Sequence, residues 1–135
     1  MSADDFFDTN VLVYLLSADQ QKADIAERLL TDGGVVSVQV LNEFASVATR
    51  KFDLGIIDLR DVLVRVRTTC QVVPLNEETH ELGLDIAERY RLSIYDAMII
   101  AAALQAGCLV LHTEDLNNGQ AVGRLVIRNP FVATG

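Results

Sequence analysis

Hydrophobic and polar positions along the chain follow two periods, and the points where the period changes mark the expected elements. Residues 3–8, which contain Phe6 and Phe7 between aspartates, are predicted to form a short strand. The apolar positions then recur at helical spacing, at Val11, Leu12, Leu15 and Leu16. Asp8 therefore stands where a strand gives way to a helix.

The same pattern continues to the end of the chain, with strands and helices in alternation. Helices are predicted over residues 22–30, 39–52, 76–91 and 93–107. A further helix is predicted to begin at a cap at Asp58 and to carry an apolar stripe that extends to Val66. Strands are predicted over residues 35–37, 71–75, 108–112 and 125–127, and residues 113–123 are expected to form a loop. This alternation predicts an α/β fold with a parallel sheet covered on both faces. In such folds, sites gather beyond the carboxyl ends of the strands.

Length and charge limit the classes of protein that fit. The 135 residues, half of them hydrophobic, suit a single domain, 1–135, with its own core. Nineteen acidic against eleven basic side chains give a net charge of -8, which argues against a broad cationic surface for nucleic acid. The apolar run 97–104 is far shorter than the roughly 20 residues that cross a bilayer, and the acidic start differs from a signal peptide. We therefore expect a soluble, cytoplasmic protein with no membrane partner.

The two cysteines, Cys70 and Cys108, lack the spacing of a zinc site and are too few for a disulfide scaffold. We expect both to be core thiols.

Four acidic residues lie at element boundaries or beside apolar stripes, and each has an ordinary structural explanation. Asp8 is placed to cap the helix that follows it, and Asp115 is placed to form a turn after a strand. Glu43 flanks the apolar stripe of its helix as a solvated edge residue would. Ser93 and Asp96 match a capping box at the start of a helix that is apolar on all sides.

Taken together, the four acids favour a common site, because the expected sheet brings strand ends and helix starts to one edge. Carboxylates about 6 Å apart repel by roughly 3 kcal/mol per pair at an effective dielectric constant near 20. Four such groups therefore require protonation or a bound cation. Oxygen ligands without His or Cys select Mg²⁺ or Mn²⁺, and these ions suit phosphodiester hydrolysis.

Four short motifs carry a resemblance to a known family. They are Asp8-Thr9-Asn10 after the first strand, Asn42-Glu43-Phe44, Tyr95-Asp96-Ala97, and Thr113-Glu114-Asp115 after a late strand. The chain resembles a PIN domain, and within that family the ribonuclease toxins of VapC type. The resemblance spans nearly the whole chain in the family's order.

The resemblance implies a three-layer α/β/α sandwich around a mostly parallel, twisted sheet of four to five strands. It also implies a Mg²⁺- or Mn²⁺-dependent endoribonuclease with Asp8, Glu43, Asp96 and Asp115 as catalytic and metal-binding residues. Thr9, Asn10, Thr113 and Glu114 are implied as supporting polar residues. Family members pair as homodimers and are silenced by a small antitoxin, so RNA, an antitoxin and a second copy are the expected partners.

The chain departs from the family where members often carry a further acid and then an aromatic residue, because Asn117 and Asn118 occupy those positions. A second fixed metal is therefore in question, and Glu114 is a candidate to compensate.

Other site chemistries fit less well. A haloacid dehalogenase needs an acid where Asn10 stands, and a receiver domain needs a late lysine that the sequence lacks. No glycine loop for a nucleotide cofactor is present. The alternative that stays open is a PIN-like module without catalysis that serves as a binding or assembly partner.

Overall fold

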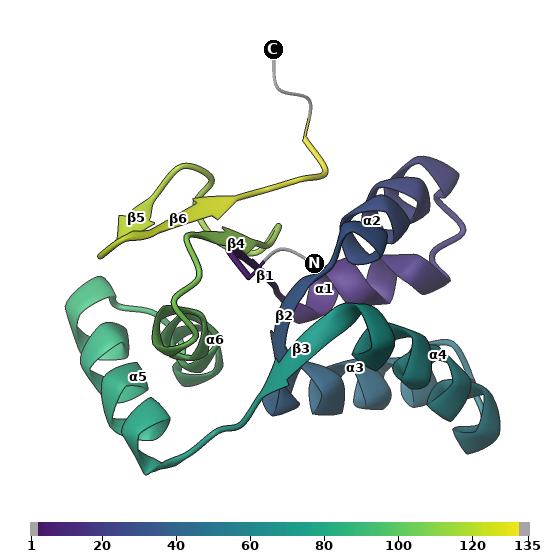
Figure 1. The fold of residues 1–135 in the computed structure, drawn as a ribbon, viewed down its shortest axis with the longest axis horizontal. Helices are drawn as coiled ribbons and strands as arrows, with labels where there is room; N and C mark the ends of the chain where they lie inside the picture. The colour runs from purple at the N-terminus through teal and green to yellow at the C-terminus, as the bar shows by residue number, and fades with distance from the viewer. Residues whose placement is uncertain (1–2, 133–135) are drawn as a thin grey trace.

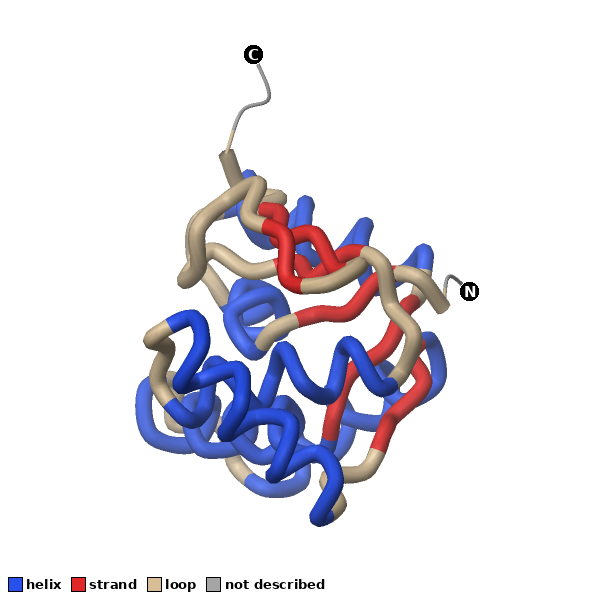
Figure 2. The backbone as a smooth tube through the Cα atoms, turned by 90° about the vertical axis from the view of Figure 1, so that its left-hand side faces the viewer, coloured by secondary structure: helices blue, strands red, loops and turns tan. Residues whose placement is uncertain are grey.

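The computed structural model describes residues 3–132; residues 1–2 and 133–135 of the expected single domain lie outside that range. A twisted sheet runs through the middle of the molecule (Figure 2). Its strands within the described range are β1 (Asp5–Phe7), β2 (Gly34–Ser37), β3 (Cys70–Val73), β4 (Val110–His112), β5 (Ala121–Val122) and β6 (Leu125–Arg128), in the order β3-β2-β1-β4-β6-β5. All neighbours are parallel except β5 and β6.

Helices cover both faces of this sheet. They are α1 (Thr9–Val13), the 3₁₀ turn η1 (Tyr14–Leu16), α2 (Gln20–Asp32), α3 (Val38–Lys51), α4 (Ile56–Thr69), α5 (Glu77–Tyr90) and α6 (Ile94–Gln105). Figure 1 shows α5 and α6 on one side of the sheet and α1 to α4 on the other. The predicted three-layer α/β/α sandwich with a mostly parallel sheet is confirmed, although the described residues form six strands rather than four to five.

The missing strand lies at the end of the segment that was predicted to be a loop. Val122 and Leu125 pair across a two-residue turn, and Gly123 in that turn has a φ of 60°. A positive φ at the first central position favours glycine and joins antiparallel strands. The prediction of a loop over all of residues 113–123 was therefore wrong at its end.

Polar caps fix several of the helix starts. The Ser37 hydroxyl accepts a hydrogen bond from the backbone nitrogen of Val40 at 3.3 Å. Asn76 and Thr79 form a reciprocal capping box at the start of α5. The predicted cap at Asp58 was wrong: Gly55 is the N-cap of α4, and Asp58 lies in the first turn, where its negative charge suits the helix dipole.

The core forms around α6, as its uniformly apolar sequence predicted. Every residue from Ala97 to Ala103 is buried. α5 packs closely against this helix at Gly83, where an added Cβ would collide with Met98 Sδ. Cys70 and Cys108 are buried free thiols, which confirms their expected place in the core. Burial raises the pKa of the Cys108 thiol to about 11, so it stays protonated at neutral pH. Within the described range, no helix has the length and apolar character needed to cross a bilayer.

The order in which successive strands are added to the sheet reverses between β1 and β4. These two parallel strands are adjacent, with Phe7 opposite His112. The residues that follow them, Asp8 and Thr113, therefore leave the same edge of the sheet side by side.

Candidate metal-binding site

Asp8 is a buried carboxylate at the end of β1, with 5% of its surface exposed. It is the N-cap of α1, because its Oδ1 accepts a hydrogen bond from the backbone nitrogen of Thr9 at 2.7 Å. Its Oδ2 accepts a hydrogen bond from the Thr113 hydroxyl, also at 2.7 Å. The capping role of Asp8 is thus confirmed. The two hydrogen bonds hold its carboxylate in a fixed position beside the end of β4.

The surroundings of Asp8 favour its protonated form more than water does. Burial raises the pKa of Asp8 to about 6, although the hydrogen bonds from Thr113 and Thr9 lower it. The nearby charges of Asp115 and Glu43 raise the pKa further. Burial is the main cause of the raised pKa and the two neighbouring carboxylates add to it, so a cation bound beside Asp8 would favour its charged form.

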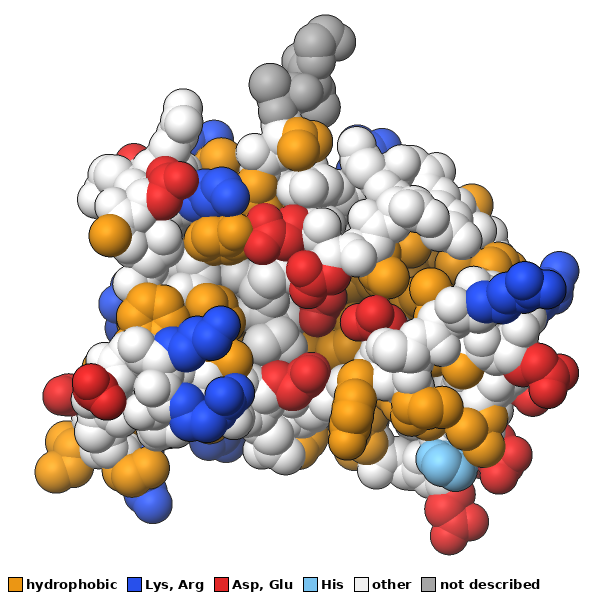
Figure 3. All heavy atoms as spheres, turned by 180° about the vertical axis from the view of Figure 1, so that it is seen from behind, with side chains coloured by type: hydrophobic (Ala, Val, Ile, Leu, Met, Phe, Trp, Pro, Cys, Tyr) orange, Lys and Arg blue, Asp and Glu red, His pale blue; other side chains and the backbone are white. Residues whose placement is uncertain are grey.

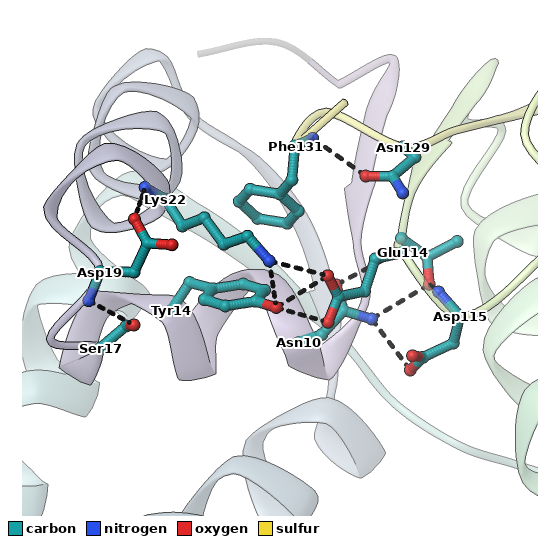
Figure 4. A network of polar contacts seen from close by, with 10 residues as sticks. Asn10, Tyr14, Ser17, Asp19, Lys22, Glu114, Asp115, Asn129 and Phe131 are labelled. Carbon is teal, nitrogen blue, oxygen red and sulfur yellow. Dashed lines mark hydrogen bonds and ion pairs between the residues drawn. The ribbon is translucent and has the colours of Figure 1, made fainter. Parts of the chain in front are cut away.

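Asn10 ties the segment after β4 to the start of α1. Its Nδ2 donates to the Thr113 hydroxyl and to Asp115 Oδ2, both at 3.1 Å, and its Oδ1 accepts from the backbone nitrogen of Glu114 at 3.3 Å. Figure 4 shows Asn10 lying between Glu114 and Asp115. The amide of Asn10 thereby holds the Asp115 carboxylate close to the end of β1.

Glu43 reaches the same place from α3. Its Oε1 accepts hydrogen bonds from the Thr9 hydroxyl at 3.1 Å and from Gln39 Nε2 at 3.2 Å. Glu43 is partly buried, so the expectation of a solvated edge residue does not describe it. Gln39 was not predicted as a site residue, because its place one helical turn before Glu43 carries no distinct signal by itself.

Asp96 lies in the first turn of α6, where the helix N-terminus stabilises its charge. Its backbone nitrogen donates to the Ser93 hydroxyl at 3.2 Å, so Ser93 caps α6 as expected, but the reciprocal bond of the predicted capping box is not formed among the described residues. Among residues 3–132, no group donates a hydrogen bond to its carboxylate. The carboxylate is therefore free to take a ligand.

One hollow, about 320 Å³ in volume, brings these carboxylates together. Its lining includes Asp8, Glu43, Asp96 and Asp115, together with Thr9, Asn10 and Lys51. Figure 3 shows acidic side chains near the centre of one face, with several Lys and Arg side chains to their left and others at the right edge. Lys51 follows Glu43 by eight residues on α3, about two turns, which explains why both face this hollow.

The chemistry of the donors fits a hard cation, because carboxylate, amide and hydroxyl oxygens are the ligands that Mg²⁺ and Mn²⁺ prefer. As placed, the side chains do not yet form a cage: across the described ranges no three His, Cys, Asp or Glu side chains lie close enough to hold an ion. Both oxygens of Asp8 keep lone pairs beyond their single hydrogen bonds.

Glu114 does not belong to this lining. Its carboxylate accepts hydrogen bonds from the Tyr14 hydroxyl at 2.7 and 2.8 Å and lies 3.9 Å from Lys22 Nζ (Figure 4). Burial and the hydrogen bond to Glu114 raise the pKa of Tyr14. Tyr14 and Lys22 draw Glu114 toward η1 and α2, so in this structure it does not stand where the missing acid would, and its role as a supporting polar residue stays a prediction.

Asn117 and Asn118, which occupy the positions of the missing acid and aromatic residue, stabilise the loop instead. Asn118 Oδ1 accepts from the backbone nitrogen of Asn129 at 3.0 Å, and Asn117 Nδ2 donates to Gln120 Oε1 at 3.4 Å. Neither side chain lines the acid hollow.

Comparison with known proteins assigns the chain to a protein family. The profile of the PIN domain family matches residues 6–121, which includes every residue of the acid hollow. The chain belongs to the PIN domain family. A search of curated proteins found no match.

Solved structures of similar fold include a toxin-antitoxin complex, a toxin and a DNA-bound complex. A toxin-antitoxin complex from Klebsiella pneumoniae superposes with a TM-score of 0.70 at 19% identity, over 93% of this chain and 96% of that chain. VapC20 of Mycobacterium tuberculosis, a toxin that cleaves the sarcin-ricin loop, gives 0.66 at 21% identity, over 82% and 89%. FitAB bound to a DNA fragment gives 0.69 at 17% identity, over 97% and 98%. At these identities the likeness establishes the fold.

Proposed function

We propose that the chain is a Mg²⁺- or Mn²⁺-dependent endoribonuclease that hydrolyses RNA phosphodiester bonds. The observation that carries the proposal is the convergence of Asp8, Glu43, Asp96 and Asp115 on one hollow from four separate segments. Membership of the PIN family supports it, since this family includes ribonuclease toxins of toxin-antitoxin systems.

In this proposal the four carboxylates hold the cation, and the neighbouring polar groups position them. When bound, the ion polarises the phosphate and lowers the pKa of an attacking water. Thr113 and the backbone of Thr9 orient Asp8, while Asn10 orients Asp115. The Thr9 hydroxyl and Gln39 orient Glu43.

The net charge of -8 opposes the approach of a polyanion, so local positive charge is needed at the hollow. The ion supplies part of it, and Lys51 at the rim supplies a fixed cation for the phosphate. Arg50, Arg65 and Arg67 stay candidates for contacts farther along the RNA.

We further propose that the chain is the toxin of a type II pair, works in the cytoplasm, forms a homodimer and is silenced by a small antitoxin. The support is the similarity to a toxin-antitoxin complex and to FitAB. An acidic toxin suits a basic antitoxin segment, because opposite charges speed association and select the partner.

Cleavage of RNA separates this proposal from the alternative of a silent PIN-like module. Purified protein is expected to cut single-stranded RNA with Mn²⁺ or Mg²⁺, to stop with EDTA, and to recover with excess Mg²⁺. Asp8→Asn and Asp96→Asn each remove a charged ligand and are expected to lower the rate on the order of 100-fold or more.

Asp61→Asn is the matched control, because Asp61 is exposed on α4 and the substitution makes the same change in net charge. It is expected to cut at the parent's rate. Normal cutting by both site variants would remove the proposed site, and absence of cutting by the parent on any RNA would favour the silent module.

A further inference from the structure

A second hollow, about 450 Å³ in volume, adjoins the acid hollow and shares Glu43 with it. It lies among α3, the start of α5 and the start of α6. Its apolar walls come from Leu75, Ile94 and Met98, and its polar groups include Asn42 and His80. The volume falls in the range of roughly 300 to 1,000 Å³ that small-molecule sites occupy.

Tyr95 lines this hollow and directly precedes Asp96 in the sequence. Tyr95 is 70% exposed, and Leu75 and Ile94 of the same lining are exposed as well, so the hollow presents a group of open apolar side chains. The backbone carbonyl of Tyr95, by contrast, is fixed, because Gln39 Nε2 donates to it at 3.1 Å. The ring therefore stands on a rigid support with most of its surface open.

Gln39 also connects the two hollows. The same Nε2 donates to Glu43 Oε1 at 3.2 Å, so one buried amide sets the position of a carboxylate in the first hollow and of Tyr95 in the second. The two hollows share Glu43, and Tyr95 of the second directly precedes Asp96 of the first, so the second hollow adjoins the place where a phosphate would lie.

We infer that the second hollow binds one nucleobase of the RNA strand, with the Tyr95 ring stacked on the base and amide and imidazole groups at its edge. This inference rests on the proposed ribonuclease function. Single-stranded RNA is recognised in general by stacking of bases on aromatic rings and by hydrogen bonds to their edges. The apolar walls of the second hollow suit stacking, and Asn42 and His80 can form hydrogen bonds with the edge of a base.

Stacking of a base would also allow RNA to bind despite the net negative charge of this protein. A base is uncharged, so its binding is not opposed by the net charge of -8 in the way that phosphate binding is. Stacking on an aromatic ring tolerates any base and strengthens binding about 10-fold or more per base. The second hollow would thus supply affinity that the acidic surface lacks.

The test combines variants of Tyr95 with RNA that lacks a single base. Cleavage by the parent is measured on an oligonucleotide and on versions in which each position near the cut is abasic in turn. One abasic position is expected to raise KM about 10-fold for the parent. Tyr95→Ala is expected to raise KM similarly on intact RNA and to lose the response to that abasic position, because the two changes remove the same contact.

Tyr95→Phe keeps the aromatic ring, so it is expected to retain the response to the abasic position that Tyr95→Ala loses. Ile57→Ala is the control for loss of an exposed apolar side chain, since Ile57 is 79% exposed on α4 and lies outside both hollows. Its KM and its response to abasic RNA are expected to match the parent's.

The outcomes separate this inference from the proposed function. A parent that cuts RNA, with Tyr95→Ala showing the same KM and the same abasic response, overturns the base site and leaves the nuclease standing. A parent that cuts no RNA overturns both. Loss of dimerisation by Tyr95→Ala in light scattering, with an unchanged abasic response, overturns the base site in favour of a second copy in the hollow.

Discussion

Asp8 shows how one residue serves both the fold and the site. Its carboxylate caps α1 and accepts a second hydrogen bond from Thr113, yet burial raises its pKa to about 6. The folded protein therefore binds the Asp8 proton more tightly than the unfolded chain does. Stability from this proton is complete below the unfolded pKa of 3.8 and is lost as pH rises through the folded pKa of about 6.

In the metal-free protein we expect Asp8 to lower the free energy of unfolding by up to about 3 kcal/mol between pH 4 and pH 7. Asp8→Asn removes the titrating group, so its free energy of unfolding should fall less over this range. Urea denaturation in EDTA at both pH values measures the difference, and Asp61→Asn should retain the parent's dependence. Equal pH dependence in the parent and Asp8→Asn would show that Asp8 titrates normally.

At the scale of residues, the sequence located the four acids because each stands at a boundary between elements or beside an apolar stripe. It did not locate Gln39, because a glutamine in a helix has no pattern of its own until its partner Glu43 is known to be partly buried. The direction of the Glu114 side chain could not be predicted from the sequence either. It depends on Tyr14 and Lys22, which lie about a hundred residues earlier and reach Glu114 only in the folded chain.

Among the elements, the pairing of β1 with β2 depends on a close approach at Gly34. A Cβ atom added at Gly34 would lie 2.6 Å from the backbone oxygen of Asp5 and 2.6 Å from the Phe7 ring. Neither neighbour can move away easily, because Asp5 and Phe7 belong to the central strand that ends at the site. At Gly55, by contrast, no atom lies within 4 Å of such a Cβ, and φ is an ordinary -71°.

We therefore expect Gly34→Ala to lower the free energy of unfolding by about 2 to 3 kcal/mol, as overpacking of a core does. Gly55→Ala loses a preferred cap residue but reduces the entropy of the unfolded chain, so it should stay within about 1 kcal/mol of the parent. Chemical denaturation of the two variants side by side checks this. Equal stabilities would mean that the β1–β2 approach is looser than described.

The sequence predicted the longer elements well, because their apolar periods persist over several turns and their caps are polar. Asn76 and Ser93 mark the starts of α5 and α6 as predicted. Short elements could not be predicted in this way, because they contain too few residues to show a period. β5, for example, contains only Ala121 and Val122. Gly123 was the available signal, since its positive φ permits the two-residue turn into β6.

For the molecule as a whole, the sheet order determines where the acid hollow lies. The order β3-β2-β1-β4-β6-β5 brings β1 beside β4, and the residues after both strands meet α3 and α6 at that edge. The sequence predicted that edge from the alternation of strands and helices. The separations among the carboxylates follow from side-chain packing, which no pattern along the chain specifies.

A crystal of the protein soaked in Mn²⁺ tests the central claim most directly, because anomalous scattering locates the ion without reference to activity. The account predicts an anomalous peak in the acid hollow, with oxygens of Asp8 and Asp96 among the ligands and Glu43 and Asp115 in direct or water-mediated contact. The same soak of Asp96→Asn should give a weaker peak or none. An empty hollow in the parent, or a peak only at other acidic side chains, would contradict the account.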